Sequence, residues 1–251
     1  MALNWRNVVT YADTAANSAN VTYTQAYTLG TSTDWLLVAV QSEGRVTASP
    51  PADVTSVKWN GVALTKIDEQ ISPVDATPEG VTVEWWGVHN PGNQGETHNI
   101  TVETSTASGG HDLSSMSFTI YEVYGGADSS IATIAKGTST LSTSLALNIT
   151  TTAAGSIVLS SASQYNGSGG PYTPGTDITE TVDSTTGASA TSDHTYWSGA
   201  KVQGSINTYA VGCVSTGSAQ NGAIMAIEIK PAPAGSTVPK KRDFYQQQMA
   251  A

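Results

Sequence analysis

The dipeptide Asn60-Gly61 is the strongest local constraint on how this chain folds. It stands between two short apolar-alternating runs, Val57-Lys58-Trp59 and Val62-Ala63-Leu64. A two-residue type I′ turn needs positive φ at both central positions, and Asn followed by Gly is the pair that adopts it most easily. The sequence therefore predicts a tight β-hairpin centred on residues 60 and 61.

The same pattern of short strands and turns recurs along the chain. Residues 81–88, 118–124 and 144–149 read as strands, and Asn90-Pro91-Gly92 is a turn signal. Turn signals every 8–12 residues or so are typical of a β-sandwich or barrel. We find no helix longer than two turns and no repeat of fixed period. We predict an all-β fold, a two-layer antiparallel β-sandwich that is jelly-roll-like, with an extended C-terminal tail.

The predicted boundaries are an N-terminal segment at 1–19, the β-sandwich domain at 20–232 and the tail at 233–251. Residues 35–40 are nearly all apolar, as expected of a central strand that is covered on both faces. Glu122 interrupts an apolar face, so we expect that end of its strand to be solvated. The predicted core residues are Trp35, Leu37, Val57, Trp59, Val83, Trp85, Ile157 and Leu159.

Length and charge restrict the function classes. The 251 residues permit one large all-β domain or two small ones. The formal net charge of −10 disfavours direct binding to nucleic acid, because an acidic surface repels the phosphate backbone. A single cysteine, Cys213, excludes an intramolecular disulfide, and its apolar neighbours indicate a buried side chain.

Targeting signals are not evident in the sequence. The first residues lack a basic patch followed by an apolar stretch, so we expect no signal peptide. No run approaches the ~18 apolar residues of a membrane span. We therefore expect a protein made in the host cytoplasm, without a membrane partner.

The turn and strand signatures resemble a widespread jelly-roll-like module of phage virion proteins and bacterial surface proteins, over roughly residues 20–232. The segments that carry the resemblance are Trp35-Leu36-Leu37-Val38-Ala39-Val40, Val57-Lys58-Trp59-Asn60-Gly61-Val62-Ala63-Leu64, Val83-Glu84-Trp85-Trp86-Gly87-Val88-His89-Asn90-Pro91, Ala154-Gly155-Ser156-Ile157-Val158-Leu159 and Ala223-Ile224-Met225-Ala226-Ile227-Glu228-Ile229-Lys230-Pro231. The resemblance implies no catalytic residues. The missing leader favours a virion protein over the secreted members.

The tail differs in composition from the body. From Lys240 it carries three basic residues and one acidic residue, whereas the rest of the chain, with seven basic and nineteen acidic residues, has a formal charge of −12. Aromatic residues and Arg are common interface hot spots, and Lys contributes through steering. We predict that the tail docks onto capsid or other virion subunits, or onto another copy of the chain, through Lys240, Lys241, Arg242, Phe244 and Tyr245.

Three sets of residues invite a chemical role, and each has a simpler interpretation. His89 and His98 flank a turn, but further metal ligands are missing, so surface histidines are the default. Asp177, Glu180 and Asp183 lie along a strand and do not match a calcium loop; a solvated acidic face is the default. Asp193-His194 near a serine suggests a hydrolase, but neighbours in sequence do not make a catalytic triad. We predict no catalytic residues, metal or cofactor.

Aromatic residues in or near glycine-rich loops are the candidate glycan-binding residues. Exposed rings can stack on the apolar face of a sugar, but the default interpretation is that they pack a loop onto the sandwich or fill a subunit interface. These residues are Tyr165, Tyr172, Tyr196 and Trp197. The predicted function is a non-enzymatic phage virion structural protein, such as a capsid decoration protein or a head- or tail-fibre component. The alternative is a carbohydrate-binding module or adhesin.

Overall fold

The computed structural model describes residues 3–13, 22–45, 53–74, 79–105, 113–165, 171–185 and 194–233. These residues form seventeen strands and no helix, and their strand pairs are all antiparallel. The predicted all-β sandwich is therefore confirmed. None of the described segments is a helix long and apolar enough for a membrane crossing.

Residues 3–124 form two packed sheets, which we call the N-terminal module. In spatial order, the strands of its inner sheet are β1 (Asn4–Asp13), β9 (Leu113–Tyr124), β3 (Trp35–Arg45), β7 (Glu79–His89) and β6 (Thr65–Ile71). The strands of its outer sheet are β2 (Thr22–Thr28), β8 (Thr97–Ser105), β4 (Asp53–Trp59) and β5 (Val62–Ala63).

Residues 126–233 form a second pair of sheets, the C-terminal module. The strands of its inner sheet are β10 (Gly126–Ser142), β17 (Gln220–Pro231), β12 (Ile157–Gln164), β15 (Thr195–Val202) and β14 (Thr179–Thr185). The strands of its outer sheet are β11 (Ser144–Thr150), β16 (Thr208–Ser215) and β13 (Tyr172–Pro174).

The two modules share one topology. Taken in spatial order, β1-β9-β3-β7-β6 matches β10-β17-β12-β15-β14, and β2-β8-β4 matches β11-β16-β13. Within the described residues, only β5 lacks a counterpart. The chain therefore builds the same sandwich twice, which the search for a repeat of fixed period did not reveal.

One pair of matching strands, β2 and β11, agrees position by position in burial. β2 and β11 each have seven residues and the same alternation of exposed and buried positions. The two buried positions hold Tyr23 and Tyr27 in β2, and Leu145 and Ile149 in β11. The modules thus keep the pattern of burial while the amino acids differ.

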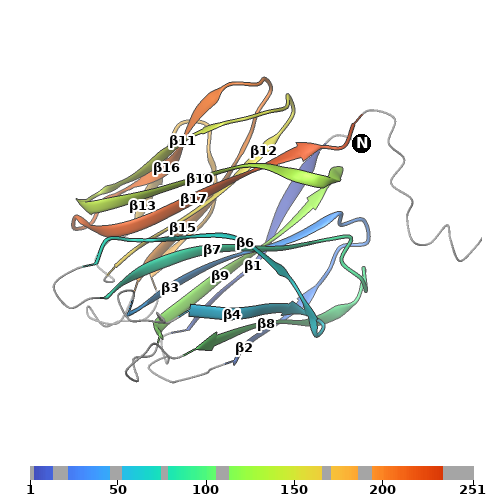
Figure 1. The fold of residues 1–251 in the computed structure, drawn as a ribbon, viewed down its shortest axis with the longest axis horizontal. Helices are drawn as coiled ribbons and strands as arrows, with labels where there is room; N and C mark the ends of the chain where they lie inside the picture. Colours follow the sequence, from blue (N-terminus) through green and yellow to red (C-terminus); the bar gives the residue numbers. More distant parts are fainter. Residues whose placement is uncertain are drawn as a thin grey trace, which may run out of the picture.

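Four sheets stack in layers, with the two inner sheets packed face to face (Figure 1). The middle core lies between the inner sheets and draws on both modules, and each module has its own outer core between its two sheets. The middle core residues are Leu37, Ala39, Val81, Val83, Trp85, Tyr121, Val123, Ile157, Leu159, Ala200, Ala223, Met225, Ile227 and Ile229.

Burial on both faces explains the sequence of the inner strands. Every side chain of residues 36–40 in β3 is at most 1% exposed, because one face contacts the outer sheet and the other contacts the second module. All eight residues of β12 are buried as well. Each module is thus a two-layer sandwich, as predicted, and the two stacked modules together have four layers.

The predicted hairpin at Asn60 and Gly61 is confirmed. Both residues have positive φ, 47° and 76°, and Trp59 pairs with Val62 across the turn. The hairpin strand β5 is short, because the chain leaves the outer sheet at buried Leu64 and enters the inner sheet as β6.

The predicted core is confirmed for seven of its eight residues, which are buried, and Trp35 is partly buried against the middle core. Cys213 is also buried, as predicted. The sandwich extends beyond the predicted start at residue 20, since β1 pairs with β9 along the edge of the inner sheet.

Candidate binding groove

Glu122, on β9, is the centre of the candidate site. The prediction that its end of the strand is solvated is wrong, because the side chain is fully buried. The structure tolerates the carboxylate by surrounding it with donors. The hydroxyls of Tyr27, Thr33 and Tyr124 donate to it, the Gly30 N–H lies 3.0 Å from Oε1, and Arg6 Nη2 lies 2.6 Å from Oε1.

Position 30 has no room for a side chain, so glycine is required there. A Cβ at this position would overlap Glu122 Oε2 and lie 2.8 Å from Tyr124 Oη. The backbone amide of residue 30 can approach the carboxylate this closely because no side chain intervenes. The turn between β2 and β3 is thereby fixed onto β9.

Arg6 extends from β1 and connects this buried cluster to the surface. Its side chain is 47% exposed, and its hydrogen bond to Glu122 raises the pKa of the guanidinium. The ion pair therefore places a charge-balanced pair of groups beside solvent.

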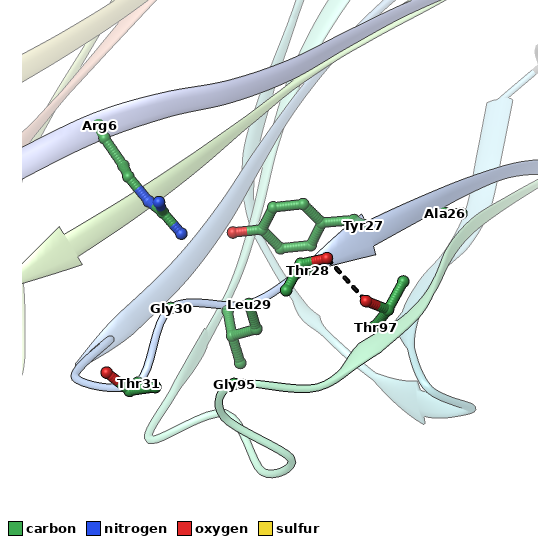
Figure 2. A pocket seen from close by; sticks show the side chains of 9 residues that line it. All are labelled: Arg6, Ala26, Tyr27, Thr28, Leu29, Gly30, Thr31, Gly95 and Thr97. Carbon is green, nitrogen blue, oxygen red and sulfur yellow. Dashed lines mark hydrogen bonds between the residues drawn. The ribbon is translucent and has the colours of Figure 1, made fainter.

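A groove of about 600 Å³ opens beside Arg6, between the end of β2, the turn that follows it and the start of β8 (Figure 2). Thr28 and Thr97 are both exposed, and their hydroxyls lie 2.7 Å apart. Figure 2 shows Arg6 on one side of the Tyr27 ring and this threonine pair on the other. The lining residues are Arg6, Ala26, Tyr27, Thr28, Leu29, Gly30, Thr31, Gly95 and Thr97.

A second, smaller hollow of about 400 Å³ adjoins the first and shares Thr97 with it. His98 lies here, with Nε2 2.8 Å from Glu96 Oε2 and its ring edge-on to Trp59. The other lining residues are Asn60, Gly61, Asn99 and Thr101. Hydrogen-bonding side chains thus extend from Arg6 to the hairpin tip.

The C-terminal module repeats the buried carboxylate with a different set of donors. Glu228 on β17 is fully buried and accepts bonds from the Thr152 N–H at 2.7 Å, Ser156 Oγ at 2.8 Å and Thr133 Oγ1 at 2.9 Å. Burial opposes ionisation of Glu228, but these hydrogen bonds outweigh it and lower the pKa of the carboxyl. All these donors are uncharged.

The two carboxylate sites differ on the side where Arg6 connects Glu122 to the surface. In the C-terminal module Thr133 takes the place of Arg6, and Ile149 takes the place of Tyr27. The threonine pair itself is kept, with the hydroxyls of Thr150 and Thr208 2.8 Å apart. The charged contact to the buried carboxylate therefore belongs to the N-terminal module alone, as far as the described residues go.

A cluster of acidic groups that the sequence analysis missed lies at the edge of the N-terminal module. Carboxylate oxygens of Asp53, Glu69 and Glu84 approach within 4.8 Å of one another. Lys66 stands among them, with Nζ 3.2 Å from Glu84 Oε2 and 3.5 Å from Asp53 Oδ1, and it also contacts Glu69. Burial and the Asp53 carboxylate raise the pKa of Glu84 well above its usual value. The lysine ammonium supplies the positive charge that these groups need.

The predicted acidic set does not converge. Glu180 Oε2 accepts a bond from Trp197 Nε1 at 3.0 Å, and Asp183 Oδ2 accepts one from the Tyr172 N–H at 2.8 Å. Asp177 lies in a turn with φ of 59°. The carboxylates of Glu180 and Asp183 are thus structural acceptors on β14, whereas Asp177 is an exposed residue of the turn before that strand.

His89 and His98, which flank the turn at Asn90-Pro91-Gly92, lie in different sheets. His89 is on β7 in the inner sheet, and His98 is on β8 in the outer sheet. His89 packs against Trp35, with ring centroids 5.2 Å apart, and His98 lies in the second hollow. The two therefore do not face each other across a hairpin. His111 lies outside the described residues.

His194 does meet serines, but in the interior. Its Nδ1 lies 2.7 Å from Ser115 Oγ and its Nε2 lies 2.9 Å from Ser117 Oγ. Ser117 donates to Gln41 Oε1 at 2.9 Å, which extends the network across the middle of the molecule. Burial lowers the pKa of His194 to about 3. The serines and the imidazole are fully buried, so they are not accessible to a substrate carbonyl in the part of the chain that the structure describes. Asp193 lies outside the described residues.

The four aromatic residues considered for glycan binding lie in the C-terminal module. Tyr172, Tyr196 and Trp197 are at most 5% exposed, and Tyr165 is partly buried against the middle core. A buried ring has no free face for a sugar, so packing accounts for the first three. The proposed docking residues Lys240, Lys241, Arg242, Phe244 and Tyr245 lie outside the described residues.

No protein-family model matches the chain, and a comparison with curated proteins finds no relative.

Proposed function

We propose that this chain is a non-enzymatic structural protein of a phage virion, either a capsid decoration protein or a component of a head or tail fibre. It acts by docking onto capsid or other virion subunits, with its own copies as further partners. The resemblance of residues 20–232 to the jelly-roll-like module of virion proteins supports this proposal.

The observation that carries the proposal is that the buried ionisable side chains form hydrogen bonds within the protein, where they stabilise the fold. Glu122, Glu228 and His194 are all fully buried and hydrogen-bonded to neighbouring strands. Buried polar groups that are fully paired fix strand positions and make a fold rigid. A rigid pair of modules joined by one shared core suits a protein whose task is to hold a position in an assembly.

The docking element in this proposal is the tail. The structure describes β17 to its end and two residues beyond, where the Ala232 N–H donates to Gly125 O at 2.8 Å. A chain that ends after Pro233 keeps every described contact but lacks the basic and aromatic residues of the tail.

The first test is mass spectrometry and electron microscopy of purified phage particles from cells that make the chain. We expect the chain in the particles at a fixed copy number, and its absence from them would refute the virion role. In the second test, the chain ending after Pro233 is expected to fold but not to enter particles or oligomers.

A matched pair of variants separates side-chain recognition from simple tail length. The double variant Phe244→Ala/Tyr245→Ala should lower incorporation, whereas Gln246→Ala/Gln247→Ala should not. Equal incorporation of all variants and the wild type at the same salt concentration would contradict the docking role of the tail.

A further inference from the structure

The internal duplication provides a comparison within one molecule. Both outer sheets carry an exposed threonine pair at matching positions, Thr28 with Thr97 and Thr150 with Thr208. At the first pair the surface is hollowed into the groove of about 600 Å³, beside an exposed guanidinium. This volume is within the range of roughly 300–1,000 Å³ that is usual for small-molecule sites.

The groove and the adjoining hollow present groups that both donate and accept hydrogen bonds. Hydroxyls of Thr28, Thr97 and Thr101 and the amides of Asn60 and Asn99 all have this dual character. The hydroxyl groups of a sugar have the same dual character, so each can form paired bonds with such a surface. The two hollows share Thr97, which suits a ligand that spans several sugar units.

Charge favours a neutral ligand. The Arg6 guanidinium is already balanced by Glu122 at 2.6 Å, and the whole chain carries a formal charge of −10. An acidic polymer would be repelled by the protein as a whole and would find no uncompensated positive charge in the groove. A neutral polymer is not repelled by the net charge of the protein and does not need an uncompensated positive charge in the groove.

An extended peptide fits the groove less well. Peptides gain affinity from apolar side chains in pockets or from pairing with a free sheet edge. Of the apolar residues of the groove, Tyr27 and Leu29 are at most 2% exposed, and the exposed Ala26 offers a single methyl group. β8 is paired on both sides, whereas β2 is the edge strand of the sheet. A peptide would therefore find no apolar pocket in the groove and would have to rely on the edge of β2 alone.

We propose that the groove of the N-terminal module, from Arg6 past Thr28 and Thr97 to Asn60, binds a neutral oligosaccharide. The site differs from the four aromatic residues considered in the sequence, and it does not depend on the virion role. Threonine hydroxyls and the asparagine amides bind the sugar hydroxyls, and Arg6 donates from one end.

The test uses the full chain on an array of malto-, cello-, xylo-, manno- and chito-oligosaccharides, together with acidic oligogalacturonates and a library of extended peptides. Isothermal titration calorimetry then measures the strongest neutral binder. We expect binding to at least one neutral series and none to the acidic series. The double variant Thr28→Val/Thr97→Val should weaken that binding by about tenfold or more, since it removes two hydroxyls while keeping shape.

The matched control is Thr150→Val/Thr208→Val, which makes the same change on the other outer sheet and should leave binding unchanged. Both variants should melt close to the wild-type temperature, because Val is well suited to exposed strand positions. The proposal is overturned by an array without neutral binders, by preference for acidic sugars or peptides, or by equal loss of binding in both variants.

Discussion

At the scale of single residues, Gly61 tests the hairpin. Its φ of 76° is a conformation that a β-branched residue adopts only under strain, and a Cβ there would meet no other atom within 4 Å. Gly61→Val should therefore lower the free energy of unfolding by about 1–3 kcal/mol through backbone strain alone.

Urea denaturation measures this change, and Gly92→Val serves as the control. Gly92 also has open space around its Cβ position, but its φ lies outside the left-handed region. An unchanged midpoint for Gly61→Val, or an equal loss in both variants, would show that the turn conformation is not what Gly61 provides.

Glu122 shows why the candidate site was hard to predict from residues alone. A single carboxylate in an apolar strand indicates a solvated end or a paired buried charge, and sequence does not distinguish these. Its partners Arg6 and Tyr27 lie far away in the chain and meet it only through the pairing of β1 with β9 and the packing of the outer sheet. The signal that was available is the recurrence of one glutamate, Glu228, in the apolar strand near the C-terminus.

At the scale of elements, strands with regular patterns were predictable and irregular edge strands were not. β2 and β11 alternate because one face is solvated, and residues 36–40 of β3 are uniformly apolar because both faces are covered. β6, with the sequence TKIDEQI, is an edge strand whose residues are partly buried by ion pairs such as that of Lys66. Its pattern is set by neighbours that the local sequence does not reveal.

The polar network around His194 links β9 to β15 and predicts a dependence of stability on pH. In the unfolded chain the imidazole takes up a proton as the pH falls through about 6.5, whereas burial keeps it neutral in the folded protein down to about pH 3. The unfolded state thus binds more protons in this window. Stability is lost as the pH falls, by about 2–3 kcal/mol between pH 6.5 and 4.5.

His194→Gln isolates this contribution, because an amide can still bond to Ser115 and Ser117 but does not titrate in this range. Urea denaturation at several pH values should show a smaller stability for the variant at pH 7 and a shallower decline toward pH 4.5. Glu84 and Glu228 titrate in both proteins, so the difference between the two curves belongs to His194. Parallel curves would contradict its burial as a neutral side chain.

At the scale of the whole molecule, duplication was hidden in the sequence for a physical reason. A sandwich needs buried positions at fixed places in its strands, and several apolar residues satisfy each place, such as Tyr23 and Leu145. The interval between matching positions also shrinks along the chain, from Thr28 and Thr150 to Glu122 and Glu228. The two modules therefore share neither residue identities nor a constant sequence interval, although they share strand order and the pattern of burial.

The shared middle core predicts that the two modules unfold together. Ile227 lies on β17 in this core, fully buried, and β17 packs on β7 of the other module. Ile227→Ala leaves a cavity at the junction and should lower the free energy of unfolding by about 2–5 kcal/mol. Because both inner sheets lose packing, hydrogen exchange should accelerate to the same extent in β8 and β16, which lie in opposite outer sheets.

Hydrogen exchange with mass spectrometry on peptides from the two outer sheets makes this measurement. Val62→Ala is the control, since Val62 is 59% exposed and its loss should change stability by at most about 0.5 kcal/mol. Faster exchange in β16 with no change in β8 would mean that the C-terminal module opens alone and that the middle core does not couple the two. Equal acceleration in both sheets would mean that the four layers behave as one cooperative unit, which is the mechanical property that a protein holding a fixed place in an assembly requires.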